Sequence, residues 1–219
     1  MPKAAIRALF GFGFFLFVIG GLFKSPTLLV IGLLMIAGGL YIGFGPNGPL
    51  RKEQVSETWA TLIEKAQGRS EGIFQDTKTF LDESKVPSLK IERREVAPGL
   101  VSGLMGKKRD FLVVTDHDSI RLRPYQIFVN ARDYGDNLDI SWFLTFRPGM
   151  WQAILSLIPF YSLIPRTLQD LNLFDQQDLR AYTANTHMCL RKAVEKMMDG
   201  LHQDPSKIDW KSKGFLGIS

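Results

Sequence analysis

Residues 125–147, YQIFVNARDYGDNLDISWFLTFR, carry the clearest folding signal in the chain. Apolar side chains alternate with other side chains along 125–132 and again along 138–147, which is the period-two pattern of strands that bury one face. The residues between these runs, 133–137, include Gly135 and are typical of a tight turn. This stretch predicts an antiparallel hairpin within a sheet of four or five strands.

Helices and further strands are predicted on both sides of this hairpin. Strand candidates lie at 90–96 and 111–115, and a long amphipathic helix should begin at Asp175. A shorter helix should begin at Ser70. Helical spacing of apolar residues predicts one more helix just upstream, with this stripe: Val55, Trp59, Leu62, Ile63 and Ala66.

Residues 1–50 have a different character, because they contain no acidic side chain and two long apolar runs. The runs, 8–23 and 28–44, are split by Lys24-Ser25-Pro26. As helices they would each extend roughly 25 Å, slightly short of a ~30 Å hydrocarbon core. We expect a two-helix transmembrane hairpin at 1–50, followed by one cytosolic domain at 51–219. The fold class is therefore α+β, with a long C-terminal helix on an antiparallel sheet.

Basic residues next to the apolar runs suggest an orientation. Lys3 and Arg7 precede the first run and Arg51 and Lys52 follow the second, whereas the turn holds only Lys24. Because cations favour the cytoplasmic side, both termini and the main domain are expected in the cytoplasm. The chain is then an integral membrane protein, in the cytoplasmic membrane if it is bacterial, with the lipid bilayer as a partner.

Glycines in the second apolar run suggest close helix packing. Gly39 and Gly43 have the four-residue spacing that lets two helix backbones approach each other. This spacing fits packing between the two arms of the hairpin, and it also fits packing between subunits of an oligomer.

An uncharged segment at 150–164 is too short to span a bilayer and is interrupted by Pro159. It is either a membrane-proximal element, within 149–165, or part of the core. Three aromatic residues and the basic cluster at 107–109 are the candidates for membrane or partner contact: Trp151, Phe160, Tyr161, Lys107, Lys108 and Arg109. The basic cluster could equally be a solvated loop.

The overall charge argues against nucleic acid as a partner. The formal net charge is +5, but three of the 27 basic residues (Lys3, Arg7 and Lys24) lie in the hairpin, which leaves 24 basic against 22 acidic residues. The remainder is thus nearly neutral and is not built to bind phosphates. Cys189 is the only cysteine, so an intramolecular disulfide is impossible, and we expect Cys189 to be a small core residue.

No arrangement of residues predicts catalysis, a metal site or a cofactor. Asp116-His117-Asp118 is expected to be a polar turn, because neighbours on an extended chain point in opposite directions. His187 and Cys189 are two apart on a helix and lie on different faces, which argues against a nucleophile pair.

The sequence therefore favours a non-enzymatic, membrane-anchored accessory or scaffold subunit of a membrane protein assembly. We expect a homo-oligomer or a part of a larger membrane protein complex. The alternative is a membrane-bound enzyme or lipid-handling module with an apolar pocket between the sheet and residues 150–164.

Overall fold

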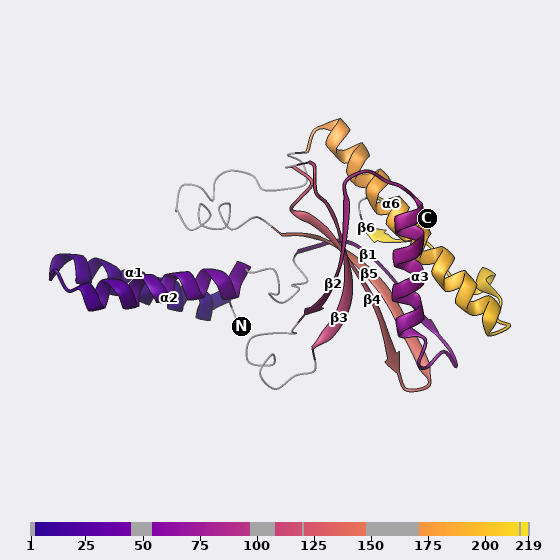
Figure 1. The fold of residues 1–219 in the computed structure, drawn as a ribbon, viewed down its shortest axis with the longest axis horizontal. Coiled ribbons are helices and arrows are strands. Elements are labelled where there is room, and N and C mark those ends of the chain that lie inside the picture. Colours follow the sequence, from indigo (N-terminus) through magenta and orange to yellow (C-terminus); the bar gives the residue numbers. More distant parts are fainter. Residues whose placement is uncertain are drawn as a thin grey trace. The chain divides into compact units, whose positions relative to one another are not determined.

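A computed structural model describes residues 3–44, 54–96, 108–119, 121–147, 171–214 and 216–218. The chain divides into two compact units, one containing a helical hairpin and the other containing a sheet with two helices. Figure 1 shows the order of these elements along the chain. Each unit is described below by itself.

The larger unit is built on a six-stranded antiparallel sheet with the order β2-β3-β4-β5-β1-β6. The fold class and the antiparallel sheet are confirmed, although the sequence predicted only four or five strands. The strands are β1 (Val55–Ile63), β2 (Leu89–Val96), β3 (Arg109–Asp116), β4 (Tyr125–Tyr134), β5 (Asn137–Phe146) and β6 (Lys213–Gly214).

Strands β4 and β5 form the predicted hairpin. Their register runs from Tyr125 opposite Phe146 to Tyr134 opposite Asn137, so Gly135 and Asp136 make a two-residue turn. Gly135 has φ of +63°, the left-handed conformation that such turns require and that glycine adopts without steric cost. Local turn chemistry thus sets the register of the central strand pair.

Strand β1 corrects one prediction, because residues 55–63 were expected to form a helix. They pair instead with β5, from Val55 opposite Thr145 to Ile63 opposite Leu138. The segment is rich in β-branched and aromatic residues, which favour strands, and the helical spacing of its apolar residues was coincidental. Pairing with a distant strand decided the outcome.

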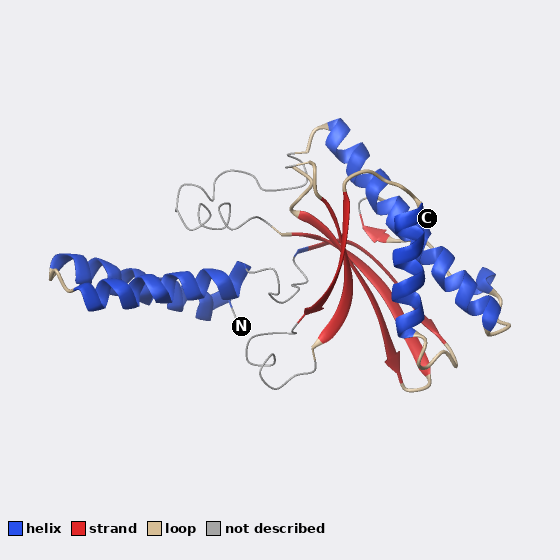
Figure 2. Cartoon of the chain, in the orientation of Figure 1, coloured by secondary structure: helices blue, strands red, loops and turns tan. Residues whose placement is uncertain are grey.

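Helices α3 (Ser70–Glu83) and α6 (Leu173–Gly200) pack on one face of the sheet (Figure 2). Their apolar side chains share one core with inward-facing residues of β1, β3, β4 and β5, including Ile127 and Trp142. The two helices run antiparallel, because Asp76 pairs with Lys196 while Ser84, directly after α3, accepts a hydrogen bond from Asn185. This arrangement leaves a groove between the two helices.

Helix α3 begins at Ser70 as predicted, whereas α6 begins slightly earlier than predicted. Asn172, not Asp175, caps α6, and its side chain accepts a hydrogen bond from the Asp175 backbone N–H at 2.8 Å while the Asp175 carboxylate accepts one from the Asn172 backbone. This reciprocal capping box satisfies two of the N–H groups that a helix start leaves free. Helix α3 is preceded by Arg69, whose side chain makes no capping hydrogen bond.

The smaller unit contains helices α1 (Lys3–Leu22) and α2 (Pro26–Phe44), joined by a turn at Lys24. Gly13, Gly20 and Gly32 are positions of close approach between the arms. A Cβ atom placed on Gly32 would lie 2.6 Å from the backbone nitrogen of Phe17, and one on Gly20 would lie 2.7 Å from that of Leu29. Glycine at these positions therefore lets the two arms pack against each other.

The expected transmembrane hairpin is not borne out. Within the described residues, no helix is both long and apolar enough to cross a membrane. The assignment as an integral membrane protein is corrected accordingly, together with the cytoplasmic placement of both termini and the main domain that depended on it.

Candidate functional site

The hairpin of α1 and α2 exposes many large apolar side chains. Leu22 and Phe23 are each 76% exposed, and Phe14 and Phe15 are each 56% exposed. We define the hairpin surface as the exposed large apolar residues of the two helices and their turn: Phe12, Phe14, Phe15, Phe17, Val18, Leu22, Phe23, Val30, Ile31, Leu33 and Leu34.

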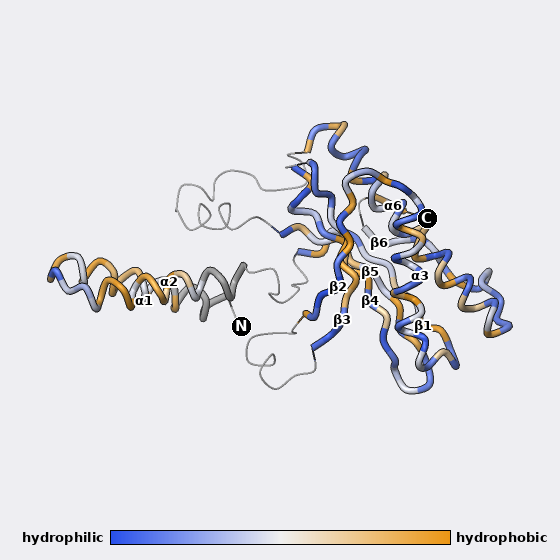
Figure 3. The backbone as a smooth tube through the Cα atoms, in the orientation of Figure 1, coloured by the Kyte–Doolittle hydropathy of each residue, from blue (hydrophilic) through white to orange (hydrophobic). Residues whose placement is uncertain are grey.

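Charge is scarce on this surface. Among the side chains described in the hairpin, Lys24 is the only charged one, and it lies in the turn. Both helices are mostly hydrophobic along their described length (Figure 3). A helix that is apolar all round is normally buried, so the packing of one arm against the other leaves apolar surface without a partner.

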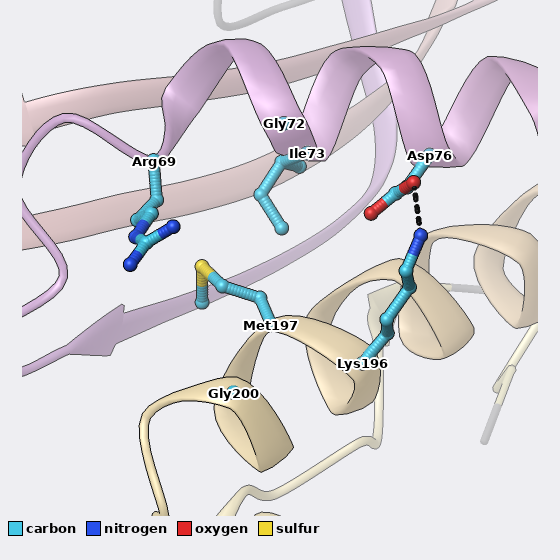
Figure 4. A pocket seen from close by; sticks show the side chains of 7 residues that line it. All are labelled: Arg69, Gly72, Ile73, Asp76, Lys196, Met197 and Gly200. Carbon is cyan, nitrogen blue, oxygen red and sulfur yellow. Dashed lines mark hydrogen bonds and ion pairs between the residues drawn. The ribbon is translucent and has the colours of Figure 1, made fainter.

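A groove lies between α3 and α6 in the larger unit (Figure 4). Its volume is about 210 Å³, smaller than the roughly 300 Å³ at which pockets for drug-sized ligands begin. Its lining comes from both helices and the residue before α3: Arg69, Gly72, Ile73, Asp76, Lys196, Met197 and Gly200.

The charged groups of this groove are not balanced. The Lys196 ammonium donates to the Asp76 carboxylate at 2.7 Å, so these two charges neutralise each other across the helix pair. Arg69 is exposed, and its guanidinium has no hydrogen-bond or ion-pair partner among the described residues. The groove therefore carries one uncompensated positive charge.

A buried histidine of α6 lies among three tryptophans. The His187 side chain is 1% exposed, and its ring centroid lies 5.5 Å from Trp59, 5.8 Å from Trp142 and 6.2 Å from Trp210. Trp142 Nε1–H donates to His187 Nδ1 at 2.9 Å, which makes Nδ1 the acceptor and places the ring proton on Nε2. Arg191 covers the outer side of Trp210, with its guanidinium carbon 5.0 Å from the ring centroid.

This environment keeps His187 neutral. Burial lowers its pKa to about 4, and the nearby positive charge of Arg191 acts in the same direction, whereas the backbone of Trp210 and the charge of Glu57 oppose the change. His187 Nε2 has no full hydrogen bond among the described residues. A neutral, enclosed imidazole of this kind contributes to packing and is not placed to exchange protons with a substrate.

A second buried group, Glu57, holds the C-terminal tail. Its side chain is 1% exposed and accepts hydrogen bonds from the backbone N–H of Leu216 at 2.7 Å, from the Ile218 N–H at 3.3 Å and from the Ser212 hydroxyl. The pairing of β1 with β5 shifts register between Val55 and Glu57. Such a bulge can change the direction of a side chain, here that of Glu57. Among the described residues, the hydrogen bonds to this carboxylate all come from the tail.

The residues predicted to contact a membrane or partner are only partly described. Trp151, Phe160, Tyr161 and Lys107 lie outside the described residues, as does the segment 150–164. Lys108 and Arg109 are exposed at the start of β3. Of the predicted packing glycines, Gly39 is buried in α2, while the surroundings of Gly43 fall outside the described residues. These predictions remain untested.

Asp116 and Cys189 were expected to be a turn residue and a core residue, respectively. Asp116 forms a turn in which its carboxylate accepts from the backbone N–H groups of Asp118 at 3.0 Å and Ser119 at 3.2 Å. Cys189 is buried in α6, and burial raises the pKa of its thiol. In the part of the chain that the structure describes, no group of three or more His, Cys, Asp or Glu residues is placed to hold a metal ion.

Sequence reasoning missed both the groove and the tail anchor. The groove joins residues about 120 positions apart, as the Asp76–Lys196 pair shows, so no local pattern could reveal it. One available signal was Glu57, an acidic residue two positions before Trp59. Comparison with known proteins found no matching family model, no similar curated protein and no similar solved structure.

Proposed function

We propose that the chain is a non-enzymatic accessory or scaffold subunit that assembles with further copies of itself through the hairpin surface. The observation that supports this proposal is the extent of exposed apolar side chains on both arms of the hairpin. Exposed apolar patches larger than a few hundred Å² usually mark interaction sites. In such an assembly each copy would contribute one larger unit.

The available area is sufficient for a stable interface. A large aromatic side chain buries about 150–250 Å². With roughly half of each side chain exposed, the hairpin surface offers on the order of 1,000 Å² per copy. A standard protein interface covers about 800 Å² per partner, so two copies have enough apolar area to associate.

A second copy suits this surface better than a charged partner would. Among the described hairpin side chains Lys24 is the only charged one, so the hairpin surface offers a partner apolar contacts rather than charge pairs. A second hairpin supplies the same apolar helices, and two hairpins form a four-helix bundle, a common arrangement for such helices. In a bundle of this kind the same surface patch serves on both subunits.

The test is the mass of the intact chain in solution, measured by sedimentation at several protein concentrations. We expect oligomers that dissociate when Phe15→Ser and Leu34→Ser are combined, because each removes a large apolar side chain from the hairpin surface. The matched control combines Leu173→Ser and Phe174→Ser, which replace one exposed Leu and one exposed Phe on α6, outside the hairpin. The control should leave the mass unchanged.

Two outcomes would contradict the proposal. One is a monomeric wild-type chain at all concentrations. The other is flotation of the chain with vesicles of phosphatidylcholine and phosphatidylglycerol, lost in the hairpin double variant, with no association between copies. That second result would mean that lipid, rather than another copy, covers the hairpin.

A further inference from the structure

The groove between α3 and α6 has open space where its two glycines lie. Gly72 on α3 and Gly200 on α6 both line the groove, and a Cβ atom added to either one would meet no atom within 4 Å. Neither glycine has the positive φ that would explain its presence by backbone conformation. Their absent side chains therefore keep the groove open rather than allow close helix contact.

Apolar atoms form part of the groove lining. Ile73 is 1% exposed and belongs to the core, and Met197 packs against that core from α6. Figure 4 shows these two side chains between the ends of the groove, with Arg69 toward one end and the Asp76–Lys196 pair toward the other. A ligand in this groove would contact apolar side chains along its length and charged groups at its ends.

The positive charge of Arg69 favours a negatively charged ligand in the groove. Asp76 is already paired with Lys196 at 2.7 Å, and Glu71, the neighbouring acid on α3, is paired with Arg93 at 2.6 Å. Neither carboxylate is therefore held by Arg69. A guanidinium presents a planar set of donors that matches a carboxylate or a phosphate, often through two parallel hydrogen bonds.

We propose that this groove binds a small organic anion, a carboxylate or phosphate carried on a compact apolar group. Arg69 binds the anionic group, and the partly exposed Met197 contacts the apolar part. The volume of about 210 Å³ limits the ligand to less than drug size. This site is separate from the hairpin surface, so its test does not depend on how copies of the chain associate.

Benzoate is a suitable probe because it joins a carboxylate to a compact apolar ring. Binding to the intact chain would be followed by changes in NMR signals of α3 and α6 during titration. We expect benzoate to bind, and benzamide, which has the same shape without the charge, to bind about tenfold more weakly or worse, since hydrogen bonds to charged groups are the stronger ones. Acetate, which lacks the apolar ring, should also bind more weakly.

Variants locate the site. Arg69→Gln should weaken benzoate binding about tenfold or more, while Lys78→Gln, which removes a cation of α3 outside the groove, should not change it. Gly72→Leu should abolish binding by filling the groove. Gly72→Ala, whose added methyl group meets no neighbour within 4 Å, should retain most of the affinity. Both Gly72 variants favour the helix, so the domain should stay folded.

Several results would overturn the proposal. Absence of benzoate binding to the wild-type chain would do so, as would equal binding of benzamide or acetate. Binding that survives both Arg69→Gln and Gly72→Leu would place the anion elsewhere on the molecule.

Discussion

Trp142 illustrates, at the scale of one residue, how a single side chain can join a strand to a helix. Its ring is buried in the shared core, and its Nε1–H donates to His187 on α6 at 2.9 Å. Trp142→Ala removes both the packing and the hydrogen bond. We expect it to lower the free energy of unfolding by about 3–5 kcal/mol, measured by urea denaturation.

Asp139, three residues earlier on β5, provides the control. Its carboxylate pairs with Arg132 at 2.8 Å near the surface, and both side chains are partly solvent-exposed. Exposed ion pairs contribute about 0–1 kcal/mol, so Asp139→Ala should change stability little. Equal losses for the two variants would mean that Trp142 does not have the central packing role described above.

The C-terminal tail shows, at the scale of an element, how a very short strand can be held in place. Strand β6 pairs with β1 through only two residue pairs, Gly214 opposite Glu57 and Lys213 opposite Thr58. A Cβ atom on Gly214 would lie 2.7 Å from the backbone oxygen of Ser56, so this close pairing needs glycine. The buried Glu57 carboxylate adds the hydrogen bonds that so short a strand lacks.

Removing this carboxylate should release the tail. In Glu57→Ala the hydrogen-bond donors of the tail lose their acceptor, so we expect trypsin to cleave faster after Lys207, Lys211 and Lys213. Mass spectrometry of timed digests measures these cleavage rates. The control is Glu64→Ala, because the Glu64 side chain is exposed and its carboxylate accepts no hydrogen bond from the tail among the described residues. Unchanged cleavage in Glu57→Ala would show that packing of Trp210 alone holds the tail.

The pH dependence of stability belongs to the whole molecule, and His187 makes a definite contribution to it. The pKa of His187 is about 4 in the folded chain, against 6.5 for an ordinary histidine. Between these values the unfolded chain binds more protons, so the stability present above pH 6.5 is lost as the pH falls toward 4. The loss is on the order of 3 kcal/mol for this group.

The free energy of unfolding, measured from pH 7 to pH 4, should show this loss. In His187→Asn the free energy of unfolding should fall less steeply with pH, whatever its value at pH 7. His202→Asn is the control, because it makes the same replacement at an exposed histidine. An NMR titration of the wild-type chain provides a direct check. Protonation of the His187 ring near pH 6.5 would contradict its enclosure among the tryptophans.

The sequence by itself determined those parts of the fold whose signals are local. The alternation along 125–147 and the turn glycine Gly135 predicted the β4–β5 hairpin, because side-chain direction in a strand has a period of two and the turn needs a left-handed residue. Helical spacing likewise predicted α6 and most of α3. These signals depend on neighbours within a few positions and need no knowledge of distant contacts.

Tertiary structure decided the features that depend on distant partners. Residues 55–63 became a strand because β5 offered them a ladder of hydrogen bonds, despite apolar spacing that suits a helix. Three other features join segments that are tens of residues or more apart: the groove, the tail anchored at Glu57 and the tryptophans around His187. The hydropathy of residues 1–50 likewise did not establish a membrane crossing. Such contacts form only when the whole chain folds, because no local pattern specifies which distant residues will meet.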